Sequence, residues 1–333
     1  MSLSWTPTKS DLEKGLRGLQ LGDVACDTIA ISTHCSTRHA EEEPLVTPIY
    51  HSTTYRIPSL EHYMKIVNDG GNLYIRLGNP TCQAAEATLS ALEGGAGAMV
   101  FTSGMAAIST VLLTFLKAGD HVIACLPVYS GTQSLLEKHL SRYNVEVSWS
   151  NLDSGVEGYR ELMKSNTRML YGETPCNPLT TIIDLEAFGQ LGNSVEGLLT
   201  VVDSTYAPPC IQRPHQYGID VVIHSGTKYL SGHSDVLAGV ASTRTLEQWQ
   251  KLNVCRTTLG TVLSPHDASL LLRGVKTLPL RMERHCRNAE KVAEFLASHQ
   301  KVNKVYYPGL ATDKGYEVAK KQMKMFGGMV ALR

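Results

Sequence analysis

Six short apolar runs recur along the middle of the chain, and the segments between them have helical spacing. CQAAEATLSALEGG (82–95) and GMAAISTVLLTFLKAGD (104–120) place apolar residues three and four apart, as on one face of a helix. Strand and helix alternating in this way predict an α/β fold whose mostly parallel central sheet is covered by helices. The apolar runs are AMVFTS (98–103), HVIACL (121–126), VEVSW (145–149), MLYGE (169–173), LLTVVD (198–203) and DVVIHS (220–225).

The pattern changes toward both ends of the chain. The first 70 residues are polar and weakly periodic, so we expect an N-terminal arm that contributes to oligomer contacts rather than a separate domain. LRMERHCRNAEKVAEFLASH (280–299) predicts a long helix, and FGGMVALR (326–333) ends the chain as a strand-like tail that we expect to lack a partner strand within the sequence. The predicted divisions are the arm at 1–70, an α/β domain at 71–268 and the start of a truncated C-terminal domain at 269–333.

Composition and charge favour small-molecule chemistry in the cytoplasm. Lys plus Arg and Asp plus Glu each number 31, and there is no basic block, so a nucleic-acid partner is not expected. The longest apolar runs are too short to span a bilayer, so no membrane association is expected. The eight cysteines have no CxxC or zinc-ligand spacing and are predicted to be free thiols in a reducing compartment. They are Cys26, Cys35, Cys82, Cys125, Cys176, Cys210, Cys255 and Cys286.

Residues that could bind a ligand or take part in catalysis follow four of the predicted strands. Gly104 and Met105 begin a predicted helix, where backbone N–H groups can cradle a phosphate. Tyr129 offers a flat face to a planar ligand, and Asp203 would be a buried carboxylate. Lys228 follows DVVIHSGT, where partial desolvation would lower its pKa and make it a nucleophile and base. Taken singly, each also has an ordinary explanation: a helix cap, core packing, a structural carboxylate or a surface lysine.

Together these features are the parts that pyridoxal phosphate needs. The cofactor requires an amine for its aldehyde, an anion opposite its ring nitrogen, a face for its ring and N–H donors for its phosphate. The motifs GxGxxG, GxxxxGK[ST], GxSxG and HExxH are absent from the sequence, which disfavours dinucleotide, P-loop, hydrolase and zinc-protease functions. His224, His233 and Asp235 flank Lys228 at a spacing that matches no metal-ligand pattern, so no metal is expected.

Six stretches resemble the Cys/Met metabolism family of pyridoxal-phosphate enzymes, the trans-sulfuration enzymes. The resemblance implies the aspartate aminotransferase-like fold, also called fold type I of the PLP-dependent transferases. The match begins near Thr28 and reaches the end of the chain in family order. The stretches are YIRLGNPT (74–81), SGMAA (103–107), ETPCNP (173–178), VVDSTYAPP (201–209), SGTKYLSGHSDVLAG (225–239) and RGVKTLPLRMERHCRNA (273–289).

The resemblance implies a role for each matching residue. Lys228 would bind the cofactor's aldehyde through its amine, Asp203 would pair with the ring nitrogen, and Tyr129 would stack on the ring. Lys228 and Tyr129 would also move protons during catalysis. The other residues expected at the cofactor are Gly104, Met105, Ser225 and Thr227 at the phosphate, Asn177 beside the 3-oxygen, and Thr205.

Tyr74 and Arg76 are implied to act on a neighbouring subunit. In the resemblance, this pair reaches the phosphate of the adjacent protomer, and the planar fork of an arginine suits a phosphate. The ordinary alternative for Arg76 is a surface ion pair. A homodimer or homotetramer acting on a small amino-acid substrate is therefore expected.

The implied activity is that of a carbon–sulfur lyase, closest to cystathionine γ-lyase, which converts L-cystathionine to L-cysteine, 2-oxobutanoate and ammonia. Gly131 stands where methionine γ-lyases carry a cysteine, and Ser134 where many γ-lyases and γ-synthases carry an arginine. Cystathionine β-lyase and cystathionine γ-synthase remain alternatives. Because the family's C-terminal domain continues past GGMV and supplies an arginine for the substrate carboxylate, another alternative is a cofactor-binding relative with weak or no activity.

Overall fold

The computed structural model describes residues 44–333, which fall into two compact units. Within the described residues, unit 1 comprises 44–114 and Ser225–Thr277, and unit 2 comprises Phe115–His224 and Leu278–Arg333. Most of the predicted arm, together with Cys26 and Cys35, lies outside the described residues. The predicted divisions at residues 70 and 268 stay predictions.

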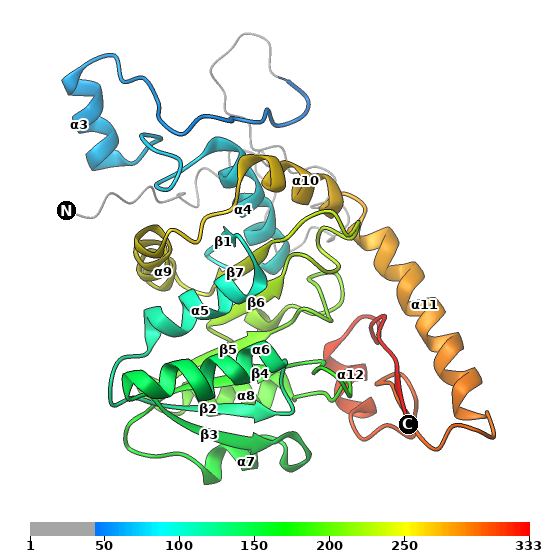
Figure 1. The fold of residues 1–333 in the computed structure, drawn as a ribbon. Helices are drawn as coiled ribbons and strands as arrows, with labels where there is room; N and C mark the ends of the chain where they lie inside the picture. The colour runs from blue at the N-terminus through cyan, green and yellow to red at the C-terminus, as the bar shows by residue number, and fades with distance from the viewer. Residues whose placement is uncertain (1–43) are drawn as a thin grey trace. The chain divides into compact units, whose positions relative to one another are not determined.

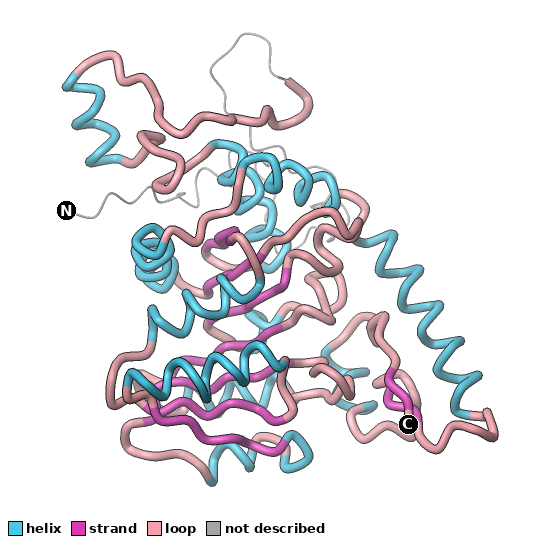
Figure 2. Tube along the Cα trace, viewed as in Figure 1, coloured by secondary structure: helices cyan, strands magenta, loops and turns pink. Residues whose placement is uncertain are grey.

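Unit 2 is built on a parallel sheet with the strand order β6-β5-β4-β2-β3 (Figures 1 and 2). β2 is buried along almost its whole length because a parallel sheet is covered on both faces, whereas β3 is more exposed because it lies at the edge. The strands coincide with five of the predicted runs, which confirms the parallel sheet. They are β2 (His121–Leu126), β3 (Glu146–Asn151), β4 (Thr167–Glu173), β5 (Leu199–Asp203) and β6 (Val221–Ser225).

Helix α8 (Leu185–Asn193) packs closely against this sheet. It begins at Asp184, whose side chain accepts a hydrogen bond from the N–H of Ala187 at 3.1 Å. A Cβ at Gly192 would lie 2.2 Å from Cγ2 of Thr200 on β5, so only glycine permits this approach. The other helical segments of unit 2 are α6 (Ser130–Ser134), α7 (Glu157–Glu161), α11 (Leu278–Ala297), α12 (Tyr316–Gln322), a π-helical turn (Leu135–His139) and 3₁₀ turns at Leu140–Tyr143, Leu152–Ser154 and Pro214–Tyr217.

The strand-like tail of the chain has a partner, contrary to the expectation from sequence. β9 (Ala331–Leu332) pairs antiparallel with β8 (Val305–Tyr306), with Leu332 opposite Val305. The predicted long helix is confirmed as α11. The pairing was missed because strands of two residues are too short to show an alternation of apolar and polar positions.

Unit 1 contains an antiparallel pair of strands, β1 (Gly97–Phe101) and β7 (Gly239–Thr243). β1 was predicted from its apolar run, but β7 was not, because GVAST consists mainly of small residues. The antiparallel pairing also differs from the parallel pattern expected throughout the sheet. The helices of this unit are α3 (Leu60–Asp69), α4 (Pro80–Glu93), α5 (Gly104–Phe115), α9 (Leu246–Leu259) and α10 (Pro265–Val275).

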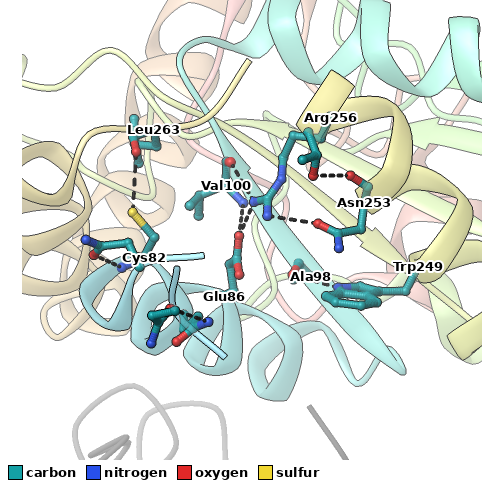
Figure 3. A network of polar contacts seen from close by, with 12 residues as sticks. Cys82, Glu86, Ala98, Val100, Trp249, Asn253, Arg256 and Leu263 are labelled. Carbon is teal, nitrogen blue, oxygen red and sulfur yellow. Dashed lines mark hydrogen bonds and ion pairs between the residues drawn. The ribbon is translucent and has the colours of Figure 1, made fainter. Parts of the chain in front are cut away.

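A buried ion pair between Glu86 and Arg256 joins α4 to α9 beside β1 (Figure 3). The two side chains are only 8% and 7% exposed. Glu86 also accepts the backbone N–H of Val100 at 3.2 Å, and Arg256 donates to Oδ1 of Asn253 at 3.1 Å. Because buried charges require partners, this network holds both helices to the middle of β1.

Trp249 fixes the start of the same strand. Its Nε1 donates to the carbonyl of Ala98 at 3.2 Å, and a Cβ at Gly97 would lie 2.4 Å from its Cδ1. The strand is thus held by side chains from α4 and α9 before the chain turns at Ser103 into α5.

None of the helices in residues 44–333 combines the length and apolar character needed to cross a membrane. Among these residues the cysteines at positions 82, 125, 176, 210, 255 and 286 are free thiols.

We predict that Glu86→Gln lowers the free energy of unfolding by about 3–5 kcal/mol, because it leaves the buried Arg256 charge without its anion. Urea or thermal unfolding monitored by circular dichroism measures the change. The matched control is Glu247→Gln, which removes the exposed pair with Lys251 on α9 and should change stability little. Equal stability of the Glu86→Gln variant and the wild type would contradict a stabilising role for the buried pair.

Candidate active site

The N-terminus of α5 forms the predicted phosphate cradle in unit 1. The side chain of Ser103 accepts the N–H of Ala106 at 3.0 Å and so caps the helix. The N–H groups of Gly104 and Met105 lie in the first turn, where a helix supplies no internal acceptors. A Cβ at Gly104 would lie 3.1 Å from both Cβ and Oγ of Ser225, so the glycine lets the serine hydroxyl approach the helix start closely. Donors suited to an anion therefore gather here.

Thr227 lies on the turn that follows β6, and its hydroxyl is held by the backbone of Ala238. The N–H of Ala238 donates to Oγ1 of Thr227 at 3.0 Å, and the N–H of Thr227 donates to the carbonyl of Ala238 at 3.2 Å. Three of the predicted phosphate residues, Gly104, Ser225 and Thr227, thus belong to a compact region of unit 1 with defined backbone positions.

Lys228 follows Thr227 on the same turn. Its backbone is fixed, because its N–H donates to the carbonyl of Ser225 at 3.1 Å and its carbonyl accepts from the N–H of Gly232 at 2.9 Å. The side chain is exposed, which corrects the expectation that the protein itself partly desolvates this amine. Lys228 stands on a tight turn beyond the end of β6, as expected from the sequence, and at this position its side chain reaches solvent.

Tyr74 and Arg76 lie together on the surface of unit 1. The backbone at Tyr74 bridges to Thr54, and the Arg76 guanidinium lies 5.6 Å from the centre of the Tyr74 ring. Nη1 of Arg76 donates to the carbonyl of Thr257 on α9 at 2.7 Å. Both side chains are exposed. A contact with a neighbouring subunit stays a prediction.

Asp203 ends β5 in unit 2 and is only 6% exposed. Its Oδ1 accepts the backbone N–H of Thr205 at 3.0 Å and the Thr205 hydroxyl at 2.6 Å. Both bonds end on Oδ1, so Oδ2 is the oxygen available to a further donor. Burial raises the pKa of Asp203, while the bonds from Thr205 and the nearby His224 act to lower it. A cationic N–H donor next to this carboxylate would therefore be strongly favoured.

Tyr129 and Asn177 occupy two loops of unit 2 that meet at one carboxylate, Glu173. The backbone N–H of Tyr129 donates to Oε2 of Glu173 at 2.8 Å, and that of Asn177 donates to Oε1 at 2.6 Å. The Tyr129 side chain is 41% exposed, so its ring has a free face, and Asn177 is half-buried. Glu173 was quoted in the ETPCNP stretch but was not predicted as a site residue. The signal available in the sequence was an acidic residue at the end of an apolar strand.

Glu173 is a second buried carboxyl beside Asp203. Cα of Glu173 pairs with that of Asp203 in the register of β4 and β5, and Glu173 is 5% exposed. Burial, together with the charge of Asp203, raises its pKa to about 8, and the N–H groups of Tyr129 and Asn177 act against this shift. Four titratable side chains near Glu173 also have raised pKa values and stay neutral. They are Cys125, Cys176, Tyr171 and Tyr206.

These residues suit pyridoxal phosphate. Unit 1 carries a helix start suited to an anion, the close approach of Ser225 to Gly104, and the amine of Lys228. Unit 2 carries the buried Asp203 with Oδ2 available for a pyridinium N–H, and the exposed aromatic ring of Tyr129. Within residues 44–333, no group of three or more His, Cys, Asp or Glu side chains is arranged to hold a metal ion.

We predict that the free energy of unfolding of the cofactor-free protein falls as pH rises from about 4.5 to about 8. The pKa of Glu173 rises on folding from 4.5 to about 8, so in this range the unfolded chain has lost a proton that the folded protein keeps. The raised pKa of Asp203 acts in the same direction.

Urea unfolding at a series of pH values tests this expectation. Glu173→Gln should flatten the slope in this range, because the amide does not titrate. A slope identical to that of the wild type would show that Glu173 does not carry the effect.

Comparisons with known proteins agree with this chemistry. The sequence model described as Cys/Met metabolism PLP-dependent enzyme matches residues 27–333. L-methionine gamma-lyase of Fusobacterium nucleatum subsp. nucleatum is 44% identical over 290 residues, covering 86% of this chain and 73% of the relative. Cystathionine beta-lyase of Lactococcus lactis subsp. cremoris is 42% identical over 284 residues, covering 85% and 72%. Cystathionine gamma-synthase of Mycobacterium leprae is 44% identical over 286 residues, covering 86% and 72%.

Solved structures extend the likeness to the fold. The crystal structure of metB from Corynebacterium glutamicum has a TM-score of 0.89 at 39% identity and covers 95% of this chain and 80% of its own. Cystathionine gamma-lyase from Lactobacillus plantarum, complexed with L-serine, has a TM-score of 0.85 at 35% identity, with 93% and 78% covered.

The predicted fold type, the lyase class and the cofactor, pyridoxal 5'-phosphate, are confirmed by these comparisons. The chain belongs to the Cys/Met metabolism family of pyridoxal-phosphate-dependent enzymes.

Proposed function

We propose that this protein is a carbon–sulfur lyase that cleaves L-cystathionine at its Cγ–S bond and releases L-cysteine, 2-oxobutanoate and ammonia. The observation that carries the proposal is the buried Asp203, whose Oδ1 is held by Thr205 while Oδ2 is left for a ring nitrogen. Buried carboxylates are costly unless they serve a cationic partner, and a protonated pyridine ring is such a partner. When bound, the cofactor withdraws electrons from the substrate's α-carbon.

Lys228 supplies the amine and moves protons. Its backbone is fixed on both sides by hydrogen bonds, while its exposed side chain keeps the freedom that a shuttle requires. Lys228 would hold the cofactor through its amine and would take the proton from the substrate's α-carbon.

Tyr129 contributes a ring face and a hydroxyl. Its backbone N–H is anchored on Glu173, and its side chain is 41% exposed, so the phenol is accessible to a substrate. We assign it stacking on the cofactor ring and proton transfer at the substrate amine or at the leaving sulfur. Asn177, anchored on the same carboxylate, would donate to the cofactor's 3-oxygen.

The γ-lyase assignment rests on α6, which begins directly after Tyr129. Gly131 on this helix stands where methionine γ-lyases carry a cysteine, which favours cystathionine over methionine as substrate. Ser134 stands where many γ-lyases and γ-synthases carry an arginine, so cystathionine β-lyase is the second candidate. The printed names of the relatives include methionine γ-lyase, cystathionine β-lyase and cystathionine γ-synthase, so the products must be measured.

We also propose that the active form is a homodimer or a homotetramer. Support comes from Tyr74 and Arg76, which are both exposed on unit 1 and lie against each other. Within residues 44–333 the Arg76 guanidinium donates through Nη1 to the Thr257 carbonyl, and its other N–H groups can serve a phosphate in a neighbouring protomer.

We predict that the wild-type protein, loaded with pyridoxal phosphate, shows a visible absorption band and releases 2-oxobutanoate and cysteine from cystathionine. Lys228→Ala should lose this band and reduce turnover by roughly 10²–10⁴-fold or more, because the amine is both the cofactor's attachment and the base. Absorption spectroscopy and chromatography of the products provide the measurement.

Product identity separates the alternatives in the same assay. Pyruvate and homocysteine would instead identify a β-lyase, methanethiol formed from methionine would identify a methionine γ-lyase, and formation of cystathionine from cysteine and an activated homoserine would identify a synthase. A wild-type protein with bound cofactor that yields neither oxoacid from cystathionine would overturn the lyase proposal.

We further predict that Gly104→Ala weakens pyridoxal-phosphate binding by roughly tenfold, about 1.4 kcal/mol. The added Cβ would lie 3.1 Å from Cβ and Oγ of Ser225 and would move the phosphate donors apart. The control is Gly71→Ala, which lies away from the cradle. There the added Cβ would lie 3.0 Å from Cγ1 of Ile66, a similarly tight contact. Fluorescence titration of the cofactor-free variants gives the affinities, and equal affinities in the two variants would contradict the cradle assignment.

A further inference from the structure

A single buried carboxylate joins the two loops that carry the aromatic ring and the amide of the candidate site. We propose that Glu173 is a positioning residue, which holds Tyr129 and Asn177 in register with Asp203 for binding of the cofactor ring. This inference rests on the proposed function, because it assigns those three residues to the cofactor.

The geometry is that of a two-armed anchor. Oε2 of Glu173 accepts the backbone N–H of Tyr129 at 2.8 Å, and Oε1 accepts the backbone N–H of Asn177 at 2.6 Å. The first donor lies 44 positions before Glu173 in the chain, at the end of the loop after β2, and the second lies four positions after it. One side chain therefore fixes two loops.

The anchor is itself fixed to β5. Cα of Glu173 pairs with that of Asp203, and beyond the strand end the N–H of Thr174 donates to the carbonyl of Asp203 at 3.1 Å. Glu173 therefore holds the loops of Tyr129 and Asn177 at fixed positions relative to Asp203. Loops at the carboxyl ends of parallel strands are where ligands bind, and this link coordinates three such ends.

Only a carboxyl group offers each of the two N–H donors an oxygen at this site. Glu173 is 5% exposed, so water cannot replace a lost acceptor. A glutamine has the same shape but only one acceptor oxygen, and its NH₂ group would face one of the two backbone N–H donors. One loop would then lose its anchor, and a displacement of about 1 Å in a positioned group can reduce the rate by roughly 10²-fold.

The test compares Glu173→Gln with a matched variant, Asp220→Asn. Asp220 is a buried carboxylate of the same unit that accepts the backbone N–H of Thr200 at 2.9 Å, at the start of β5 rather than its end. Both substitutions replace a carboxyl oxygen by an NH₂ group and disturb a carboxyl–backbone hydrogen bond, so both should lower stability. Only Glu173→Gln should weaken binding of pyridoxal phosphate, by roughly tenfold, and lower kcat with cystathionine by roughly 10²-fold.

Hydrogen exchange measured by mass spectrometry gives a readout that does not involve the cofactor. In the cofactor-free protein, Glu173→Gln should speed exchange in one of the two peptides covering 127–133 and 174–180, whereas Asp220→Asn should speed it near the start of β5. If Glu173→Gln fails to fold, the shorter Glu173→Asp variant takes its place. It keeps the charge but cannot reach both donors, so it should release one of the two peptides.

The outcomes distinguish this inference from the proposed function. If Glu173→Gln binds the cofactor as tightly as the wild type, or affects binding no more than Asp220→Asn, Glu173 is not a positioning residue. If exchange rises at one or both of these loops and cofactor affinity falls, the inference is supported, whichever sulfur substrate is turned over. A wild-type protein that binds the cofactor but cleaves no sulfur amino acid overturns the lyase proposal and leaves the anchor intact.

Discussion

The central constraint in unit 2 is the burial of two carboxyl groups, Asp203 and Glu173, at the ends of the adjacent strands β5 and β4. A carboxylate removed from water must receive hydrogen bonds, and the donors come from the chain that follows or faces each strand. Thr205 supplies them to Asp203, and the N–H groups of Tyr129 and Asn177 supply them to Glu173. The need to satisfy these groups therefore determines the conformations of the loops that carry the chemistry.

Unit 1 also contains a buried charged group, the guanidinium of Arg256. The buried guanidinium of Arg256 is neutralised by Glu86, and this pair joins α4 and α9 to β1. β1 leads into α5, whose first turn presents the N–H groups of Gly104 and Met105. A rigid strand thus precedes a helix start whose donors must keep a fixed position to hold a phosphate. In each unit, a buried ionisable side chain supports the residues assigned to the cofactor but is not itself assigned to it. This side chain is Arg256 in unit 1 and Glu173 in unit 2.

The sequence predicted those features that depend on local pattern. Apolar runs located β1 to β6, and the small and charged residues that follow them located Gly104, Asp203 and Lys228. β7 and the β8–β9 pair were missed because small residues and two-residue strands carry little periodicity. Glu173 was missed for another reason: its partners are backbone N–H groups, which have no signature in the sequence. The exposure of Lys228 depends on where a turn leaves the sheet, which residue type alone does not determine.

Overall similarity does not identify the substrate of this chain. Proteins named methionine γ-lyase, cystathionine β-lyase and cystathionine γ-synthase match it at 44%, 42% and 44% identity, so the degree of identity does not select among the three reactions. Gly131 and Ser134 differ from family expectation and both lie on α6, directly after Tyr129. Since the N–H of Tyr129 is bound to Glu173, the carboxylate that positions the ring also sets where α6 begins. The Glu173 carboxyl therefore holds the backbone from which the helix carrying Gly131 and Ser134 begins.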